Sequence, residues 1–440
     1  MKVLKFGGTS VGSAQRMKDV AKLITDGEQK IVVLSAMSGT TNTLVEISDY
    51  LYKKNPEGAN EIINRLESKY KQHIDELYST EEHKQKTLEF VKSVFDYIRS
   101  FTKDIFTLFE EKVILAQGEI ISTNMVTNYL CEQGVKAYLI PALEFMRTDK
   151  NSEPDLNYIR EKLAAQLEAH QGQDIYITQG FICRNAYGEI DNLQRGGSDY
   201  TASLIGAAIN ASEIQIWTDI DGMHDNDPRV VDKTSPVRQL HFEEAAELAY
   251  FGAKILHPTC IQPAKYANIP VRLLNTMEPS APGTLISNDT EKGKIKAVAA
   301  KDNITAIKIK SSRMLLAYGF LRKVFEIFES YQTAIDMVCT SEVGVSMSID
   351  NTKHLNEIVN DLKKYGTVTV DHDMCIVCVV GDLEWENVGF EAKALDAMRD
   401  IPVRMISFGG SNYNISFLIR ECDKKKALQS LSDVLFNAGK

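Results

Sequence analysis

Apolar positions along the first two-thirds of the chain alternate between two spacings. Short apolar runs typical of buried strands occur at residues 2–6, 30–35, 135–141, 174–181, 213–218 and 269–274. Between these runs, apolar residues recur at the three-to-four-residue spacing of helices, at residues 13–24, 41–52, 117–133, 156–169, 202–211 and 242–253. Strands that alternate with helices predict an α/β fold, in which an open, mostly parallel sheet has helices on both faces.

Two further segments break this alternation. Residues 57–112 are polar and helical without a strand signal, which indicates a helical insertion, and we expect it to form a lobe over the active cleft. Residues 284–302 are rich in polar residues and glycine, which favours a linker.

Beyond the predicted linker, the order strand–helix–strand–strand occurs twice. The two helices start at Gly319-Phe320 and Gly389-Phe390, 70 residues apart. We therefore expect two ferredoxin-like α+β units, which are typical of ligand binding and regulation rather than of chemistry. The predicted domains are residues 1–290, 303–372 and 373–440.

Composition narrows the classes of function. A chain of 440 residues with 44% hydrophobic and 25% charged residues is long enough for two or three globular domains. Its net charge of −10 argues against nucleic acid or an anionic membrane as a partner. It has no membrane-length apolar run and no signal-peptide pattern. Seven scattered cysteines fit a reducing cytoplasm, and we expect the pair Cys375 and Cys378 to be core residues of a strand.

Residues 195–202 read Arg-Gly-Gly-Ser-Asp-Tyr-Thr-Ala and precede an apolar helix. The glycines allow close approach of the backbone to a ligand, and a helix start offers free N–H groups to an anion. We expect Ser198 or Asp199 to be the N-cap. Arg195 adds a planar fork that can hold a carboxylate or phosphate. Taken alone, the segment is equally compatible with a simple tight turn.

The chain start contains a second candidate anion site. Lys5 ends the first predicted strand, and Gly7-Gly8-Thr9-Ser10 leads into the first helix. Glycines, hydroxyls, a helix start and a cation are the parts of a phosphate-binding turn. The spacing matches neither the Walker motif nor the dinucleotide fingerprint. Two such sites indicate two anionic groups held near each other.

Other polar residues are ambiguous on sequence grounds. The acids after Trp217 lack the spacing of a calcium loop, and either a nucleotide contact at a strand end or a surface turn explains them. Lys254 is either an exposed cation at a helix end or a polyphosphate ligand. His257 favours a structural role. Glu119 lies within an apolar helix, where a carboxylate needs a cationic partner, and a substrate ammonium would serve.

Together these motifs resemble the aspartate kinases, whose amino-acid kinase fold is followed by paired ACT domains. The resemblance covers nearly the whole chain, at residues 5–10, 35–42, 118–119, 179–181, 195–202, 217–222, 227–229 and 251–258. We expect no homoserine dehydrogenase half of the kind that bifunctional relatives carry. The segments 314–321, 335–336 and 340–342 are most similar to the single-function, lysine-sensitive branch.

The resemblance implies roles for individual residues. The catalytic residues would be Lys5 and Asp199. Nucleotide and phosphate binding would involve Lys5, Gly7, Gly8, Thr9, Ser10, Thr218, Asp219, His224, Arg229 and Lys254. The aspartate site would contain Ser35, Thr41, Glu119, Phe181, Arg195, Ser198 and Asp199, with Arg195 on the α-carboxylate and Glu119 near the α-ammonium. The effector site would contain Met314, Gly319, Phe320, Leu321, Ile335, Asp336, Ser341 and Glu342. Departures from the family pattern are His224 for tyrosine, Gln194 for glycine and Ala317 for a polar residue.

The implied activity is ATP-dependent phosphorylation of aspartate to 4-phospho-L-aspartate, the first step of lysine, threonine and methionine biosynthesis, with feedback inhibition by lysine at the ACT domains. Mg²⁺ would accompany ATP, and no residue is expected to be a dedicated metal ligand. We expect a cytoplasmic homodimer or dimer of dimers assembled through the ACT domains. Two alternatives stay open: a kinase of the same fold acting on glutamate, carbamate or a nucleoside monophosphate, and a non-catalytic amino-acid-binding regulator.

Overall fold

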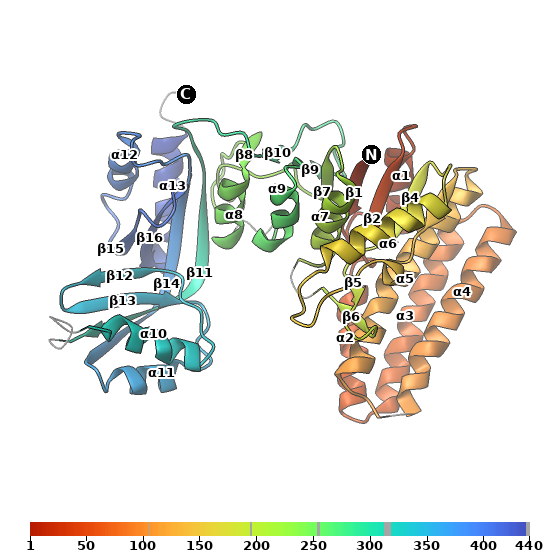
Figure 1. The fold of residues 1–440 in the computed structure, drawn as a ribbon, viewed down its shortest axis with the longest axis horizontal. Coiled ribbons are helices and arrows are strands. Elements are labelled where there is room, and N and C mark those ends of the chain that lie inside the picture. Colours follow the sequence, from red (N-terminus) through yellow and green to blue (C-terminus); the bar gives the residue numbers. More distant parts are fainter. Residues whose placement is uncertain (104, 194–195, 253–255, 312–317, 437–440) are drawn as a thin grey trace. The chain divides into compact units, whose positions relative to one another are not determined.

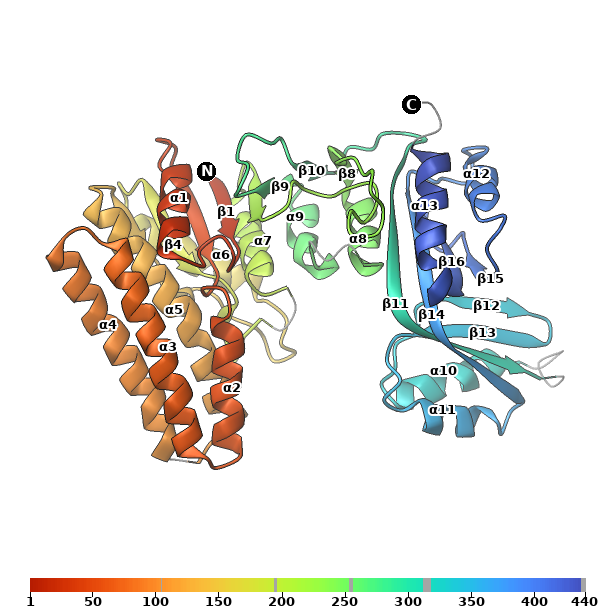
Figure 2. The same cartoon turned by 180° about the vertical axis from the view of Figure 1, so that it is seen from behind.

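A computed structural model of the chain describes residues 1–103, 105–193, 196–252, 256–311 and 318–436 (Figures 1 and 2). The predicted residues Gln194, Arg195, Lys254, Met314 and Ala317 lie outside the described residues. The chain divides into two compact units, one made of residues 1–223 and 256–288 and the other of residues 224–255 and 289–440.

The first unit is built on a mostly parallel sheet, which confirms the predicted α/β class. Parallel strands stand in the order β3-β4-β2-β1-β7-β9, and β10 joins β9 antiparallel. Every residue of β2 and β4 is buried, so both faces of the sheet are covered. The strands are β1 (Lys2–Phe6), β2 (Lys30–Leu34), β3 (Ala137–Leu139), β4 (Ile175–Gln179), β7 (Ile214–Thr218), β9 (Val271–Asn275) and β10 (Thr284–Ser287), with a separate hairpin of β5 (Ile182–Arg184) and β6 (Ile190–Asn192).

Helices fill the connections between these strands. They are α1 (Ala14–Ile24), α2 (Thr40–Tyr52), α3 (Pro56–Leu77), α4 (Glu81–Ser100), α5 (Leu108–Glu132), α6 (Leu156–Ala169), α7 (Gly197–Ile209) and α9 (Gln262–Tyr266), with short 3₁₀ turns η1 (Phe101–Lys103), η2 (Ala142–Glu144) and η3 (Pro258–Ile261). The boundary of α7 corrects the predicted N-cap: Gly196, not Ser198 or Asp199, occupies that position, with φ at 71°. The apolar run therefore placed the start of this helix about one turn too far along the chain.

The predicted insertion consists of α3, α4 and the start of α5, which lie side by side with α2 in both views (Figures 1 and 2). Their apolar faces belong to the same hydrophobic core as β1, β2 and α1. In α3 this face follows the helical spacing at Ile62, Leu66, Tyr70 and Ile74. The helices therefore pack into the body of the unit and do not form a separate lobe over a cleft.

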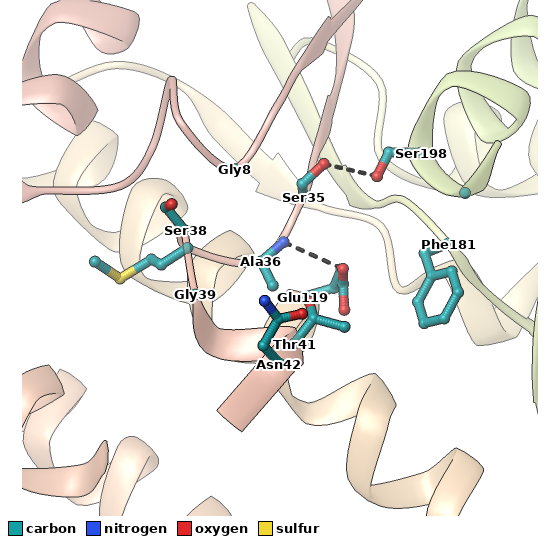
Figure 3. Close-up of a pocket in the computed structure, with 12 residues that line it drawn as sticks. Gly8, Ser35, Ala36, Ser38, Gly39, Thr41, Asn42, Glu119, Phe181 and Ser198 are labelled. Carbon is teal, nitrogen blue, oxygen red and sulfur yellow. Dashed lines mark hydrogen bonds between the residues drawn. The ribbon is translucent and has the colours of Figure 1, made fainter. Parts of the chain in front are cut away.

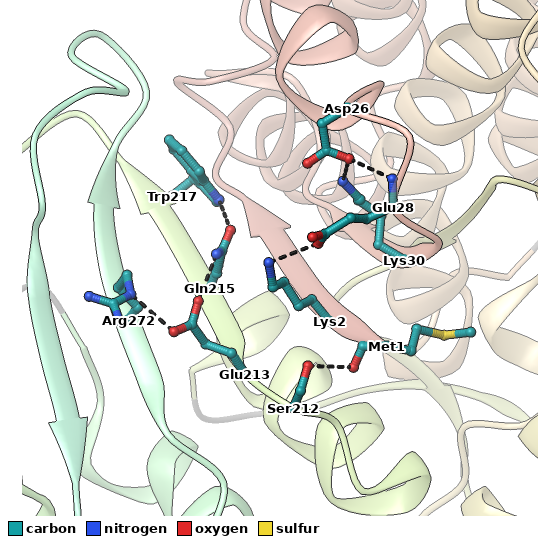
Figure 4. Close-up of polar contacts among 10 residues, drawn as sticks. All are labelled: Met1, Lys2, Asp26, Glu28, Lys30, Ser212, Glu213, Gln215, Trp217 and Arg272. Atoms are coloured by element: carbon teal, nitrogen blue, oxygen red, sulfur yellow. Dashed lines mark hydrogen bonds and ion pairs between the residues drawn. The ribbon is translucent and has the colours of Figure 1, made fainter.

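The amino-terminal edge of the sheet is closed by internal ion pairs (Figure 4). Lys2 pairs with Glu28 at 2.8 Å, and Arg272 pairs with Glu213 at 3.0 Å. Lys30 is 1% exposed and pairs with Asp26. These charged groups are therefore paired with one another at this edge.

The second unit contains β8 (Gln239–His241), α8 (Phe242–Tyr250) and a six-stranded sheet in the order β12-β13-β11-β14-β16-β15, whose adjacent strands pair antiparallel. Its remaining elements are β11 (Ile295–Lys310), α10 (Phe320–Ser330), β12 (Val338–Ser341), β13 (Gly344–Ile349), α11 (Leu355–Leu362), β14 (Thr367–Gly381), α12 (Phe390–Ala397), β15 (Val403–Ser407), β16 (Asn414–Arg420), η5 (Glu421–Asp423) and α13 (Lys424–Leu435). One apolar core lies under α10 and α11 and another under α12 and α13. This matches the two predicted α+β repeats.

The predicted linker at residues 284–302 is wrong. It contains β10 and the first part of β11, which pairs with β14 along its length. The sequence around Ala297–Ala299 is rich in lysine and contains a glycine, which obscures the apolar pattern of this short run. In the structure the run is buried in the sheet. Cys375 and Cys378 are both fully buried in β14, as the sequence predicts. None of the helices in the described ranges is both long and apolar enough for a membrane span.

Candidate functional site

The predicted site residues of the first unit gather at one edge of its sheet. Parallel strands end at the same edge, so the segments that follow β1, β2, β4 and β7 are neighbours there. The chain leaves β1 toward β2 on one side, while β7 occupies the other side of β1. Ligands of open α/β sheets bind at such a reversal of strand order. The segments there begin with Gly7, Ser35, Gly180 and Asp219.

The glycine turn after β1 is held against the turn after β2. The Ser38 amide donates to the Gly8 carbonyl at 3.1 Å. A Cβ on Gly8 would lie only 2.8 Å from the Ala36 carbonyl oxygen, so this approach requires glycine. A Cβ on Gly7 would lie 3.6 Å from Lys5 Nζ. The glycines thus keep the space around the Lys5 ammonium open.

Lys5 is buried at the end of β1 and forms an ion pair with Asp199. The two side chains are 11% and 17% exposed, and Lys5 Nζ lies 2.6 Å from Asp199 Oδ1. Asp199 stands in the first turn of α7, where the helix dipole stabilises a carboxylate. The pair fixes an ammonium group at the carboxyl edge of the sheet.

The start of α7 is packed too closely for side chains. A Cβ on Gly196 would lie 1.7 Å from the Cys260 sulfur, and a Cβ on Gly180 would lie 2.4 Å from that of Ser198. Burial, followed by the nearby Asp199 charge, raises the pKa of Cys260 to about 12, so its thiol is neutral. No sequence pattern points to Cys260. His257 accepts the Thr259 amide at 3.3 Å and caps η3, which supports its predicted structural role.

A cavity of about 320 Å³ opens at this edge (Figure 3). Ser35 and Ser198 meet across it, with their hydroxyl oxygens 2.7 Å apart. Phe181 adopts φ of 70° and is anchored by its amide, which donates to Thr201 Oγ1 at 3.0 Å. The lining comprises Gly8, Ser35, Ala36, Met37, Ser38, Gly39, Thr41, Asn42, Glu119, Phe181, Gly197 and Ser198. It therefore includes the predicted aspartate-site residues Ser35, Thr41, Glu119, Phe181 and Ser198.

Glu119 gives this cavity a buried carboxyl group. The residue is 4% exposed, and its Oε1 accepts the Ala36 amide at 3.2 Å. Its Oε2 has no hydrogen-bond partner within the part of the chain that the structure describes. Burial raises the pKa of Glu119 to about 7. The neighbouring Gly118 allows close packing, because a Cβ there would lie 2.8 Å from the Ala36 Cβ. The carboxyl group is thus placed to accept a cation from the cavity.

The predicted phosphate-binding residues of the first unit flank the same edge. The Gly7 amide donates to the Trp217 carbonyl at 3.4 Å, next to Thr218 and the exposed Asp219. Ser10 Oγ lies 2.8 Å from Thr276 Oγ1. The amide of Thr276 donates to the Thr218 carbonyl at 2.8 Å. The carbonyl of Thr9 accepts from Arg16.

His224 and Arg229 belong to the second unit and have partners there. His224 Nδ1 lies 2.9 Å from Thr234 Oγ1. Arg229 makes a bidentate contact with Asp227 at 2.9 and 2.8 Å, and this hydrogen bonding lowers the pKa of Asp227. Their predicted role at a nucleotide stays a prediction.

The predicted effector residues surround α10 and β12 in the second unit. Gly319 is the N-cap of α10 with φ of 80°, Phe320 is buried and Leu321 is 37% exposed. Ile335 is half-buried, while Ser341 and Glu342 are exposed at the β12–β13 turn.

The Asp336 side chain is 2% exposed and already has partners. Its Oδ1 lies 2.8 Å from Lys301 Nζ and accepts the Tyr250 hydroxyl at 2.7 Å. Lys301 also reaches Asp350 at 2.9 Å. Sequence reasoning missed Lys301 and Tyr250, because both partners come from elements distant in the chain.

No group of three or more His, Cys, Asp or Glu side chains in the described ranges could hold a metal ion.

Comparisons with known proteins agree with the fold and identify the family. The model of the amino acid kinase family matches residues 1–275, and that of the ACT domain matches residues 377–435. Aspartokinase 1 of the Arabidopsis thaliana chloroplast is 35% identical over 460 residues, covering 99% of this chain and 80% of the relative. Lysine-sensitive aspartokinase 3 of Escherichia coli is 32% identical and covers 99% of both chains. The crystal structure of E. coli aspartokinase III with aspartate and ADP is 31% identical, covers 99% of this chain and 100% of the other, and has a TM-score of 0.82.

Proposed function

Because this chain belongs to the aspartokinase family, we propose that the cavity beside Lys5 is where it phosphorylates L-aspartate. The enzyme transfers the terminal phosphoryl group of ATP to the side-chain carboxylate and forms 4-phospho-L-aspartate. The observation that carries the location is the convergence of Lys5, the Gly7–Ser10 turn and Glu119 at one sheet edge.

Glu119 is proposed to bind the α-ammonium of aspartate. Its unpartnered Oε2 and its deep burial support this role, because a cation in the cavity satisfies a carboxylate that water cannot reach. The hydroxyls of Ser35, Thr41 and Ser198 line the remaining polar wall, and Phe181 supplies an apolar one. Arg195 is proposed, from the sequence motif, to hold the α-carboxylate through two hydrogen bonds.

The chemistry requires little proton transfer. A β-carboxylate with a pKa of about 4 is ionised at neutral pH, so it attacks without a base. One carboxylate oxygen forms a bond to the γ-phosphorus, the bond to the bridging oxygen breaks, and its electron pair leaves with ADP. The barrier is repulsion between two anions, and the Lys5 ammonium with the Gly8 amide supplies compensating positive charge, since the Gly7 amide already donates to the Trp217 carbonyl.

The nucleotide is proposed to lie along the Gly7–Ser10 turn and the end of β7 at Thr218 and Asp219. His224, Arg229 and Lys254 are further proposed contacts. Mg²⁺, when bound with ATP, would neutralise charge on the β- and γ-phosphates. The oxygen donors after β7 are of the type that Mg²⁺ takes, alongside the phosphate oxygens themselves.

A coupled ADP-release assay tests the function. We expect ADP formation that depends on L-aspartate, with little or none when L-asparagine, which lacks the nucleophilic carboxylate, replaces it. L-Glutamate, carbamate and nucleoside monophosphates test the alternative acceptors of this fold. A protein that releases ADP equally with and without aspartate would refute the proposal.

Feedback inhibition by lysine at the ACT units is part of the same function, and we propose Asp336 as the ligand of the effector's side-chain ammonium. The ion pair between Asp336 Oδ1 and the Lys301 ammonium, at 2.8 Å, supports this, because this carboxylate already accepts an ammonium group of the same kind. The second oxygen of Asp336 is buried without a hydrogen-bond partner among the described residues.

We also propose a cytoplasmic enzyme that assembles through its ACT units into a homodimer or a dimer of dimers. Seven unpaired cysteines favour a reducing compartment. Trp385 and Val388, ahead of α12, are 76% and 95% exposed and offer apolar surface for association. Light scattering on protein eluted from a size-exclusion column measures the molar mass of the assembly. A monomer at micromolar concentration would contradict the proposed dimer.

A further inference from the structure

Helix α3 contacts the turn between β2 and α2, which borders the substrate cavity. We define this turn, residues 35–42, as the β2–α2 turn. Its residues Ser38, Gly39, Thr41 and Asn42 line the cavity. Because those residues are proposed to receive aspartate, any group that fixes the turn also fixes part of the site.

The start of α2 has no side-chain cap of its own. Its N-cap is Gly39, with φ of 83°, and no side chain there satisfies the free amides of the first turn. The first helical residue, Thr40, is 1% exposed. Its hydroxyl lies 2.9 Å from the Tyr70 hydroxyl of α3. The start of α2 is therefore held from outside by a side chain of the helical pair.

Tyr70 is itself firmly placed. It is 1% exposed, lies on the apolar face of α3, and its ring centroid is 5.9 Å from that of Phe95 in α4. A buried tyrosine hydroxyl needs a hydrogen-bond partner, and Thr40 is that partner. The preceding residue, Lys69, donates to the Ser38 carbonyl at 3.4 Å. Two consecutive residues of α3 thus contact the β2–α2 turn.

Tyr70 also lies in the electrostatic field of Glu119. Burial raises the pKa of Tyr70 strongly, and the Glu119 charge adds to this effect. On the other side of Thr40, its methyl group would be 3.1 Å from a Cβ on Gly118. Thr40 is therefore enclosed between Tyr70 and the segment that presents Glu119, so a shift of Thr40 disturbs both sides of the cavity.

We infer that Tyr70 is a positioning residue for the amino-acid substrate, and that the helical pair α3–α4 braces the aspartate pocket through the Tyr70–Thr40 hydrogen bond. The inference rests on the proposed function of the cavity. It assigns a role to the helical segment, which the family motifs do not cover.

Tyr70→Phe tests the inference, because it removes only the hydroxyl. We expect KM for aspartate to rise about two- to tenfold, the range that one neutral hydrogen bond supports. KM for ATP should rise less than KM for aspartate, because the Gly7–Ser10 turn contacts Trp217 and Thr276 in addition to its Ser38–Gly8 bond to the β2–α2 turn. The value of kcat should stay within twofold of that of the unchanged protein. Thr40→Val removes the bond from the other side and should give the same effect, and the double variant should be no worse than either single one.

Tyr78→Phe is the matched control. Tyr78 is buried at the end of the same helix, about 12 Å further along its axis, and its hydroxyl donates to the Met125 carbonyl at 2.8 Å. This variant should lower the melting temperature as much as Tyr70→Phe and leave KM for aspartate unchanged.

The possible outcomes separate the two levels of the argument. If the unchanged protein is active and Tyr70→Phe has the same KM for aspartate, the bracing role is overturned and the proposed function stands. Equal rises of both KM values, or equal KM effects of Tyr70→Phe and Tyr78→Phe, also overturn it. An unchanged protein without aspartate-dependent activity instead overturns the proposed function.

Discussion

Replacing Lys5 by methionine separates its catalytic role from its structural one. The substitution keeps an unbranched side chain that is one atom shorter and removes its charge. If the ammonium stabilises charge in the transition state, kcat should fall about 10²–10³-fold, as when one preorganised donor is removed from an active site. KM for ATP should change by less than about threefold, because the Gly7–Ser10 turn and the end of β7, which are proposed to bind the nucleotide, stay in place.

The same substitution leaves Asp199 without its partner. The ion pair spans 2.6 Å, and its side chains are only 11% and 17% exposed. Removing one partner of a buried pair lowers the free energy of unfolding by about 3–5 kcal/mol. The dipole of α7 stabilises the remaining carboxylate by about 0.3–1 kcal/mol, which offsets part of this loss. We therefore expect a net loss of about 2–4 kcal/mol, which lowers the melting temperature by about 4–16 °C.

Comparison with the double variant Lys5→Met/Asp199→Asn completes the test. Neutralising Asp199 removes the unpaired charge, so most of the melting temperature should return, while kcat should stay low. Steady-state ADP release and thermal melts at pH 7.5 measure the two quantities on the same samples. A single variant with kcat within threefold of the unchanged protein, or a double variant that regains activity together with stability, would refute a direct role of Lys5 in phosphoryl transfer.

Further predictions concern Glu119, the glycine turn and the effector site. Because burial holds the pKa of Glu119 at about 7, KM for aspartate should rise as pH falls from 8 to 6, and a flat profile would count against Glu119 as the ammonium ligand. Since this pKa lies above the ordinary 4.5, ionisation of Glu119 should also make the ligand-free protein less stable as pH rises from about 4.5 to about 7; thermal melts of Glu119→Gln should lack this component. Gly8→Ala brings a Cβ to 2.8 Å from the Ala36 carbonyl and should cost about 1–3 kcal/mol of stability in thermal melts with a large loss of kcat/KM; wild-type values of both would show that the turns can separate freely. Asp336→Asn should raise the lysine concentration for half inhibition at least tenfold, and Lys301→Met should lower it, in the ADP-release assay; unaltered inhibition in Asp336→Asn would remove Asp336 from the effector site.

The sequence predicted the parts of this protein that depend on local pattern. The strands of the parallel sheet follow from short apolar runs, and the turn at Gly7 and Gly8 follows from glycines next to a strand end. The buried carboxyl of Glu119 could be expected from a charged residue within an apolar helix. In each case one segment carries the whole signal.

Features that depend on packing between distant segments were missed or misplaced. Gly196, not Ser198, caps α7, because Cys260 leaves no room for a side chain there. The pairing of Tyr70 with Thr40 and of Lys301 with Asp336 joins residues about thirty positions apart, and no local pattern announces either contact. The composition of residues 284–302 predicts a linker, whereas pairing with β14 makes the start of β11 a strand.

Phosphorus NMR of a reaction with ATP, Mg²⁺ and L-aspartate tests the central claim most directly. The claim is that the fixed positive charge of Lys5 lets the aspartate carboxylate react with the terminal phosphoryl group of ATP. We predict a new acyl-phosphate resonance that appears with ADP, disappears when hydroxylamine is added, and is lost in Lys5→Met. Formation of ADP and inorganic phosphate alone, with aspartate unmodified and no acyl phosphate trapped, would contradict the account.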